Sequence, residues 1–318
     1  MRWDYYKRMA LNYLREPDRI ADELASARRR RQARTARLAP LPTTPAAELP
    51  VVVSLTSYGP RIARVQLAIR SIMDQTVRPN RVELWLGEDA DGIALPQELV
   101  ALEEVGLTIH RGVRDLKGHK KYLFSMREER DVLLVTIDDD LVYTRDTIES
   151  LVRAHEALPH AVVARRCHRM TFTDDHDRIA PYASWDMDFR AERPTASRTL
   201  LATTGAGTLY PPETFEALVA DEADIARLAL TADDLWMKAM ELNHGIEVAA
   251  APNDRPMPYV MPMSQSGGLF FENLHDGGND QVLARLMDHF GLTPHDFQDA
   301  PGEGLPILRA RDADGQRP

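Results

Sequence analysis

The sequence has little that would suit a secreted or membrane-embedded protein. Its 318 residues include one cysteine, Cys167, which can form no internal disulfide and has no CxxC partner for a zinc site. The longest apolar runs, such as residues 51–55 and 132–135, are far shorter than the roughly 18–20 residues that a membrane-spanning helix needs. The N-terminus has no apolar stretch behind its positive charges, as a secretory signal would have. We therefore expect a cytoplasmic protein.

An excess of positive over negative charge is found only at the N-terminus. The net charge is −10, but residues 1–38 hold eleven Lys and Arg against five Asp and Glu, which leaves about −16 for the remainder. An acidic body argues against nucleic-acid binding and suits divalent cations. Residues 1–50 read as an appendage, with a basic helical arm at 1–38 that contains the run Arg28–Arg31 and a Pro-rich linker at 38–50. The arm fits peripheral contact with an anionic membrane face, or equally a coil or oligomerisation segment.

From residue 51 onward, short apolar runs alternate with helical patterns. This alternation is typical of βαβ units and predicts an α/β fold with a mostly parallel, Rossmann-like sheet flanked by helices. We assign residues 51–300 to this domain and residues 301–318 to a C-terminal tail. Strands are predicted at 51–57, 81–88, 107–112, 132–138, 161–167 and 246–250, and helices at 64–76, 96–106, 120–130, 148–158 and 231–245.

The strongest local signal is a strand that stops at three carboxylates. Residues 132–137 look buried, and Asp138, Asp139 and Asp140 follow them directly. Such charges cannot continue unpaired into a core, and ligands of open α/β sheets bind beyond the carboxyl ends of the strands. Oxygen ligands of this kind suit Mg²⁺ or Mn²⁺, which can neutralise the charge of a departing nucleoside diphosphate. An isolated acidic triplet is more often a solvated turn, but the buried strand before it favours the metal site.

Three segments carry a resemblance to a known family. They read SLTSYGPRI at 54–62, SIMDQTVRPNRVELWL at 71–86 and TIDDDLVY at 136–143. In this order they resemble inverting family-2-type glycosyltransferases of the GT-A fold, most closely a bacterial subgroup associated with surface polysaccharides. The similarity covers roughly residues 51–250. One motif differs, because the family's DDGSxDGT after the second strand is replaced by GEDADG at 87–92.

The resemblance implies a metal-dependent transfer of sugar from a UDP- or GDP-linked donor to a glycan or lipid-linked acceptor. It implies Asp138 and Asp140 as ligands of Mn²⁺ or Mg²⁺, with His275 as a further candidate, although a lone histidine is usually structural or exposed. Further residues are expected near the nucleotide sugar. These are Thr56, Ser57, Tyr58, Glu88, Asp115, Lys120, Lys121, Asp138, Asp139, Gly205, Ala206 and Gly207.

Each of these positions also has a plain structural reading. Residues 56–58 could be a tight turn after a core strand, and lysines such as Lys120 and Lys121 are more often solvated. Lysine does suit a diphosphate as a point charge. The segment TTGAGTLYPP at 203–212 combines small residues with hydroxyls and fits a β-turn. It also permits a close backbone approach to a sugar, and its position in the resembling family favours this functional reading.

The catalytic base is expected at the start of the helix at 231–245. Thr231 is a plausible N-cap, and Asp233 and Asp234 follow in the first turn. Acidic residues there also simply favour the helix dipole. By the resemblance one of the pair is the base, with Asp234 preferred. Trp236 directly after the pair could form a sugar platform, but packing is the expected role.

Together these residues predict a single displacement with inversion at the anomeric carbon, since no nucleophile for a covalent intermediate is evident. Two alternatives stay open. A sugar-phosphate nucleotidyltransferase would share the sheet and the acidic metal ligands, but it normally begins with a GxGTRLxP-like segment that SLTSYGPRI does not match. A non-catalytic carbohydrate-binding protein of the same fold would tolerate alanine at Asp138, Asp140 and Asp234.

Overall fold

The computed structural model describes residues 18–252, 258–261 and 278–299. Its helices are α2 (Asp18–Thr35), α3 (Gln66–Met73), α4 (Gln97–Val100), α5 (Lys120–Glu128), α6 (Thr147–Ala157), α7 (Phe215–Leu218), α8 (Glu222–Leu228), α9 (Asp233–Asn243) and α11 (Gly278–Phe290). Its strands are β1 (Val51–Ser57), β2 (Arg81–Gly87), β3 (Leu107–Val113), β4 (Leu133–Ile137), β5 (Leu141–Val142), β6 (Val162–Ala164), β7 (Cys167–Arg169), β8 (Asp186–Phe189), β9 (Thr195–Ala196), β10 (Leu200–Ala202), β11 (Ala206–Tyr210), β12 (Val248–Ala250) and β13 (Tyr259–Val260).

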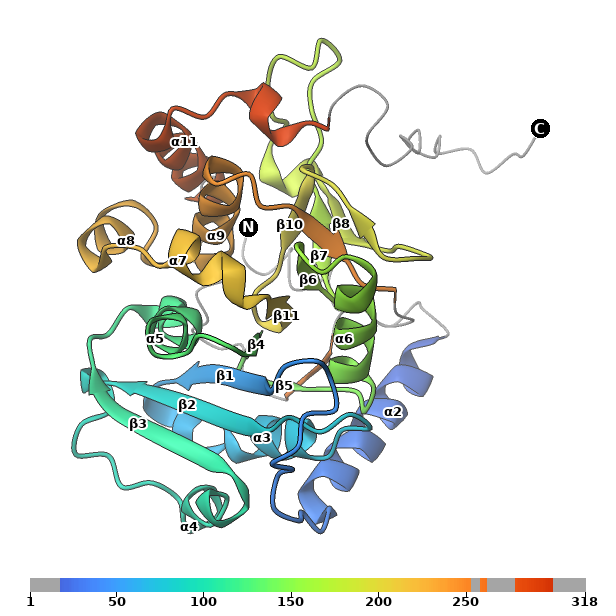
Figure 1. Cartoon of the computed structure of the whole chain (residues 1–318), viewed down its shortest axis with the longest axis vertical. Helices are drawn as coiled ribbons and strands as arrows, with labels where there is room; N and C mark the ends of the chain where they lie inside the picture. Colours follow the sequence, from blue (N-terminus) through green and yellow to red (C-terminus); the bar gives the residue numbers. More distant parts are fainter. Residues whose placement is uncertain (1–17, 253–257, 262–277, 300–318) are drawn as a thin grey trace.

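One eight-stranded sheet organises the chain, in the order β3-β2-β1-β4-β11-β6-β12-β9 (Figure 1). Strands β3, β2, β1 and β4 run parallel, as do β6 and β12, whereas β11 is antiparallel to both of its neighbours. Smaller sheets pair β10-β7-β8 and β13-β5. The predicted α/β fold with a mostly parallel sheet flanked by helices is confirmed.

Two apolar layers cover the faces of this sheet. Alternate residues of β1 enter different layers, because successive side chains of a strand point to opposite faces. Val53 packs in the layer that contains Ile69 of α3, and Val52 packs in the layer that contains Leu123 of α5 and Trp236 of α9. Trp236 is only 1% exposed, which is the packing role expected for it.

Two of the predicted elements are wrong in extent. The expected strand at 161–167 is split, since β6 belongs to the large sheet and β7 to the three-stranded sheet. Arg165 and Arg166 lie between them, and Arg165 pairs with Asp146 at 3.1 Å. The expected helix at 96–106 forms only the short α4 and a 3₁₀ turn, which ends at Gly106 with a φ of 116°.

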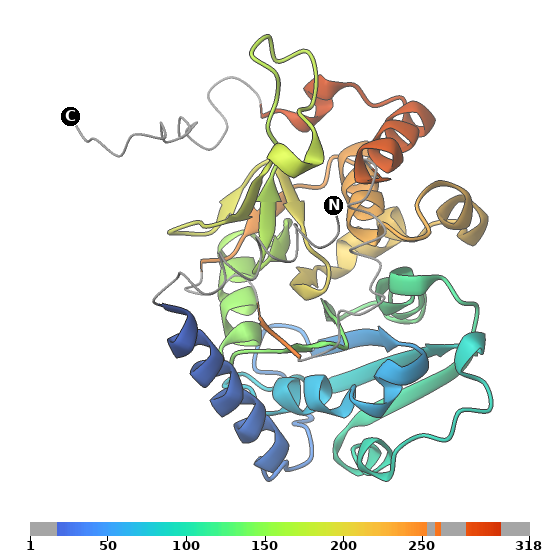
Figure 2. The same cartoon turned by 180° about the vertical axis from the view of Figure 1, so that it is seen from behind.

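The N-terminal helix α2 lies against the body rather than apart from it. It packs on α3 and β5, and Figure 2 shows it running along the outer side of α3. Ser26, Arg29 and Ala33 are buried in this contact. Residues 1–17 and the predicted tail lie outside the described residues. No helix in the described part of the chain is long and apolar enough to cross a membrane.

Candidate active site

The parallel strands β1, β2 and β4 bring their carboxyl ends to one edge of the sheet. Ser57 ends β1, Gly87 ends β2, and Asp138 follows β4 directly. Antiparallel β11 begins at this edge, and the Asp138 amide donates to the Gly205 carbonyl at 3.0 Å just before β11. The acidic triplet therefore emerges beside the turn at 203–205.

The three carboxylates of the triplet have different partners. Asp138 accepts from the Lys121 ammonium at 2.7 Å, and its side chain remains 42% exposed. Asp139 is 5% exposed and accepts from the Ser57 hydroxyl at 2.6 Å and from Arg61 at 2.9 Å. Arg61 also reaches Asp140 at 3.2 Å. Asp138 thus faces solvent most openly, whereas Asp139 is held inside.

Lys121 joins the triplet to the start of α9. Its buried ammonium lies 2.7 Å from Asp138 and 2.9 Å from Asp233. Burial alone would lower the pKa of this lysine, but the carboxylates of Asp138, Asp233 and Asp234 outweigh burial and raise it well above its ordinary value. Lys121 is therefore a permanent cation between two acidic groups, not the solvated lysine of the plain structural reading.

The two acids of α9 are held by Thr204. Its hydroxyl lies 2.9 Å from Asp233 and 2.7 Å from Asp234, and its amide donates to Asp234 at 2.8 Å. Burial and the charge of Asp233 raise the pKa of Asp234 to about 6. Burial would also raise the pKa of Asp233, but Lys121, His119 and hydrogen bonds lower it to about 2. Two adjacent carboxylates thus acquire different basicities.

The residues of the triplet fit a divalent cation. Burial and the nearby charge of Asp138 raise the pKa of Asp140 to about 7, although Arg61 opposes the shift. A cation between these two carboxylates would relieve that repulsion. No three His, Cys, Asp or Glu side chains gather as a protein-only metal site within the described ranges. Mg²⁺ usually takes one or two carboxylates together with substrate phosphates, so Asp138 and Asp140 suffice in number. His275 lies outside the described residues.

A second charged group follows β2 and β3. Lys120 is 1% exposed and lies 2.6 Å from Asp115 and 3.7 Å from Asp89. Burial would raise the pKa of Asp115, but hydrogen bonds from Lys117 and Lys120 lower it to about 2. The ammonium of Lys120 is thus directed to Asp115 and not to an open surface.

The remaining predicted contacts occupy varied positions along this edge. Tyr58 is 37% exposed, with the Arg61 guanidinium 5.1 Å from its ring centre, and Glu88 is exposed. The Thr56 hydroxyl donates to the Trp85 carbonyl at 2.8 Å. These three residues lie at the carboxyl ends of β1 and β2.

The small residues at 205–207 mainly serve packing. A side chain at Gly205 would place its Cβ 1.8 Å from the Asp138 carboxylate, so glycine makes room for that group. Ala206 and Gly207 are buried inside β11, and a Cβ at Gly207 would lie 3.2 Å from Thr147 of α6. The close approach expected from these small residues is therefore an approach to Asp138 and to α6.

Sequence reasoning did not single out three residues that organise the site. Arg61, Tyr143 and Thr204 lie inside the quoted segments SLTSYGPRI, TIDDDLVY and TTGAGTLYPP, yet none was named as a candidate. Arg61 had a usable signal, because an arginine four residues after a strand end can reach charges at the same edge. Tyr143 contacts main-chain groups through its hydroxyl, and Thr204 contacts Asp233 and Asp234 of a distant helix, and residue types reveal neither set of contacts.

Comparisons with known proteins give similarity in structure only. No family model matches the chain, and no curated protein matches it in sequence. Among solved structures, TarS 1–349 of S. aureus is 15% identical, with 76% of this chain and 72% of that chain covered and a TM-score of 0.48. The mannosyltransferase PcManGT of Pyrobaculum calidifontis, in complex with GDP-Man and Mn²⁺, is 15% identical, with 86% and 78% covered and a TM-score of 0.45. GalNAc-T7 with UDP, GalNAc and Mn²⁺ is 11% identical, with 64% and 42% covered and a TM-score of 0.45.

Proposed function

We propose that this protein is a metal-dependent glycosyltransferase that moves a sugar from a UDP- or GDP-linked donor to an acceptor hydroxyl. One observation carries the proposal: the Lys121 ammonium pairs with Asp138 of the triplet and with Asp233 of α9, next to Asp234, at the carboxyl edge of the sheet. This arrangement brings a candidate cation-binding group and the acid pair that contains the candidate base to the same ammonium group. The PcManGT complex contains GDP-Man and Mn²⁺, and the GalNAc-T7 complex contains UDP, GalNAc and Mn²⁺.

Asp138 and Asp140 would hold Mn²⁺ or Mg²⁺ together with the donor's diphosphate. The ion would neutralise the negative charge that develops on the leaving nucleoside diphosphate. Lys121 adds a second fixed positive charge beside Asp138, in a buried position where electrostatic interactions are stronger than in water. Arg61 keeps Asp139 and Asp140 oriented at the edge.

Asp234 is the proposed general base. Its pKa of about 6 leaves it ionised at neutral pH yet basic enough to take a proton from an acceptor hydroxyl. Asp233, with a pKa of about 2 and an ion pair to Lys121, is a much weaker base. This difference supports the preference for Asp234. A base on one side and a metal-held leaving group on the other suit a single displacement with inversion.

The nucleoside would lie along the ends of β1 and β2. Tyr58 offers an exposed ring for stacking, and Glu88 and Asp115 offer carboxylates for ribose or base. Lys120, turned toward Asp115, would hold that carboxylate in place and would not contact phosphate itself. A role in surface polysaccharide or glycoconjugate synthesis, in the cytoplasm, fits the resemblance of the sequence.

Calorimetric titration with UDP and GDP, with and without Mn²⁺, tests the donor site. Wild type should bind one nucleotide in a Mn²⁺-dependent way, and Asp140→Ala should lose that dependence. The matched control is Asp131→Ala, because Asp131 is exposed and precedes the opposite end of β4. Equal Mn²⁺-dependent binding by Asp140→Ala and wild type would contradict the site.

Product analysis then identifies the reaction. Incubation with UDP- or GDP-sugars should release the nucleoside diphosphate, and NMR of the product should show an inverted anomeric centre. Release of pyrophosphate from a nucleoside triphosphate and a sugar 1-phosphate would instead identify a nucleotidyltransferase. Binding without turnover of any donor, unchanged in Asp234→Asn, would favour a carbohydrate-binding protein.

Helix α2 suits peripheral contact with an anionic membrane through its outer face. Arg28, Arg31 and Arg34 are exposed there, and Leu24 beside them is 66% exposed, whereas Arg29 points inward. Basic residues near an anionic surface are each worth about 1 kcal/mol. Wild type should float with vesicles that contain phosphatidylglycerol and not with pure phosphatidylcholine. A triple change of the three exposed arginines to glutamine should abolish flotation, and its persistence would refute the contact.

A further inference from the structure

We propose that Arg29 of α2 is a positioning residue of the donor site, acting through Tyr143 on Asp138 and on the turn at Gly205. The inference rests on the proposed function, because that function makes the acidic triplet a donor site. The hydrogen bonds of Arg29 and Tyr143 do not depend on it. The helix α2 would then contribute to substrate binding, which is a separate role from the proposed membrane contact.

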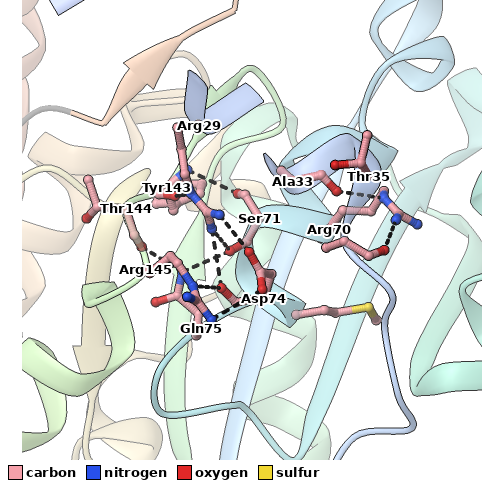
Figure 3. A network of polar contacts seen from close by, with 12 residues as sticks. Arg29, Ala33, Thr35, Arg70, Ser71, Asp74, Gln75, Tyr143, Thr144 and Arg145 are labelled. Atoms are coloured by element: carbon pink, nitrogen blue, oxygen red, sulfur yellow. Dashed lines mark hydrogen bonds and ion pairs between the residues drawn. The ribbon is translucent and has the colours of Figure 1, made fainter. Parts of the chain in front are cut away.

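Arg29 is buried and hydrogen-bonded to three residues of the body of the protein (Figure 3). It is 5% exposed, and its Nε donates to the Tyr143 carbonyl at 2.7 Å. Its two terminal nitrogens reach the Ser71 carbonyl at 2.8 Å and the Asp74 carboxylate at 2.7 Å. Because guanidinium donors form a rigid planar fork, these three bonds fix the Tyr143 main chain relative to α2 and α3.

Tyr143 links this contact to the acidic triplet. Its main chain is held by Arg29 and also by the Ser71 hydroxyl, which accepts from the Tyr143 amide at 3.0 Å. Its fully buried hydroxyl accepts from the Asp138 amide at 2.8 Å and donates to the Gly205 carbonyl. One end of this residue therefore contacts the N-terminal helix and α3, and the other contacts both sides of the site.

The two peptides that meet the Tyr143 hydroxyl set the geometry of the site. The Asp138 peptide begins the triplet. The Asp138 carboxylate occupies the space that a Cβ at position 205 would need. The neighbouring Thr204 amide orients Asp234 at 2.8 Å. A shift of the hydroxyl would thus move the proposed metal ligands and the proposed base relative to each other.

A second arginine provides a matched comparison. Arg70 also holds the end of α2, through the carbonyls of Ala33 at 2.9 Å and of Ala36, just after the helix, at 2.5 Å, but no described contact joins it to Tyr143. If α2 is only a packed helix, Arg29→Gln and Arg70→Gln should have similar consequences. If Arg29 positions the site, only Arg29→Gln should resemble Tyr143→Phe, which removes the hydroxyl and leaves the ring.

The first measurement is hydrogen exchange of the full-length protein without ligands. Peptides that cover residues 138–143 should exchange at least about tenfold faster in Arg29→Gln and Tyr143→Phe than in wild type, because a buried hydrogen bond is lost. In Arg70→Gln the same peptides should exchange as in wild type, while those of α2 exchange faster. Unchanged exchange at 138–143 in Arg29→Gln would overturn the proposal.

The second measurement is the affinity for UDP and GDP with Mn²⁺, compared at matched thermal stability. Arg29→Gln and Tyr143→Phe should bind about tenfold more weakly, and Arg70→Gln within about twofold of wild type. Equal weakening in both arginine variants would reduce Arg29 to a structural role and overturn the proposal. If wild type binds neither nucleotide although exchange responds as expected, the proposed function fails and the positioning of the triplet stands.

Discussion

Replacement of Lys121 by methionine tests the charge balance on which the site depends. Lys121 is 3% exposed and pairs with two carboxylates, those of Asp138 and Asp233. Methionine keeps most of the side-chain volume but leaves both acids without their cation. Breaking a buried ion pair costs about 3–5 kcal/mol. Because the Asp138 side chain is 42% exposed and water can solvate it, we expect the low end of that range, about 3 kcal/mol at pH 8.

The loss of stability should depend on pH in a definite direction. In wild type the pKa of Asp233 is lowered to about 2, so its contribution is present above its ordinary pKa of 3.8 and lost as pH falls toward 2. Without Lys121, burial raises the pKa of Asp233 and raises that of Asp234 further. These buried charges then cost stability at high pH, and the cost falls as the carboxylates take up protons. The variant should therefore lie closer to wild type at pH 5 than at pH 8.

Urea unfolding of wild type and Lys121→Met at pH 5 and pH 8 measures both effects. Arg153→Met is the control, because Arg153 forms an exposed i,i+4 pair with Glu149 on α6. Such a pair should change the free energy of unfolding by about 0.5 kcal/mol or less at either pH. A deficit for Lys121→Met that is as large at pH 5 as at pH 8, or absent at both, would refute the reasoning.

Three further predictions concern catalysis. The rate of sugar transfer should rise with pH through about 6, as Asp234 loses its proton, and a pH–rate profile already flat at pH 5 would count against this base. Asp234→Asn should lower kcat by about 10²–10⁴-fold while calorimetry finds Mn²⁺-dependent nucleotide affinity within about twofold of wild type; a matching loss of affinity would argue for a binding role. Gly205→Ala should abolish that affinity, because its Cβ would lie 1.8 Å from the Asp138 carboxylate, and retained binding by titration would show that the turn can adjust.

The sequence predicted the parallel half of the sheet well. Strands β1, β2, β3 and β4 agree with prediction to within about one residue, because each is a compact apolar run next to turn-forming residues. The prediction at 161–167 was wrong because it joined two strands across Arg165 and Arg166, whose charges mark the change of sheet. The acidic triplet could be located because a buried strand ends in charges only where something satisfies them.

The contacts between distant parts of the site could not be predicted. Lys121 meets Asp233 only because α5 and α9 pack on the same face of the sheet, and no local pattern encodes that distance. The separation of the pKa values of Asp233 and Asp234 depends on this contact, so the sequence could name both as bases but not rank them physically. Tyr143 was seen as the end of a motif, while its function lies in the hydroxyl that contacts Asp138 and Gly205.

The reversed direction of β11 has a consequence for how this region tolerates change in length. Active-site segments of α/β proteins are usually loops that accept insertions. Here Gly205 and Ala206 are tied to the end of β4 by the Asp138–Gly205 hydrogen bond and the Ile137–Ala206 pairing, and the register shifts between Ala206 and Thr208. Because Gly207 already occupies this irregularity, a second extra residue would have to enlarge it or shift β11 by one step, which turns its side chains to the opposite face. Engineering of acceptor preference should therefore alter side chains in this segment and leave its length untouched.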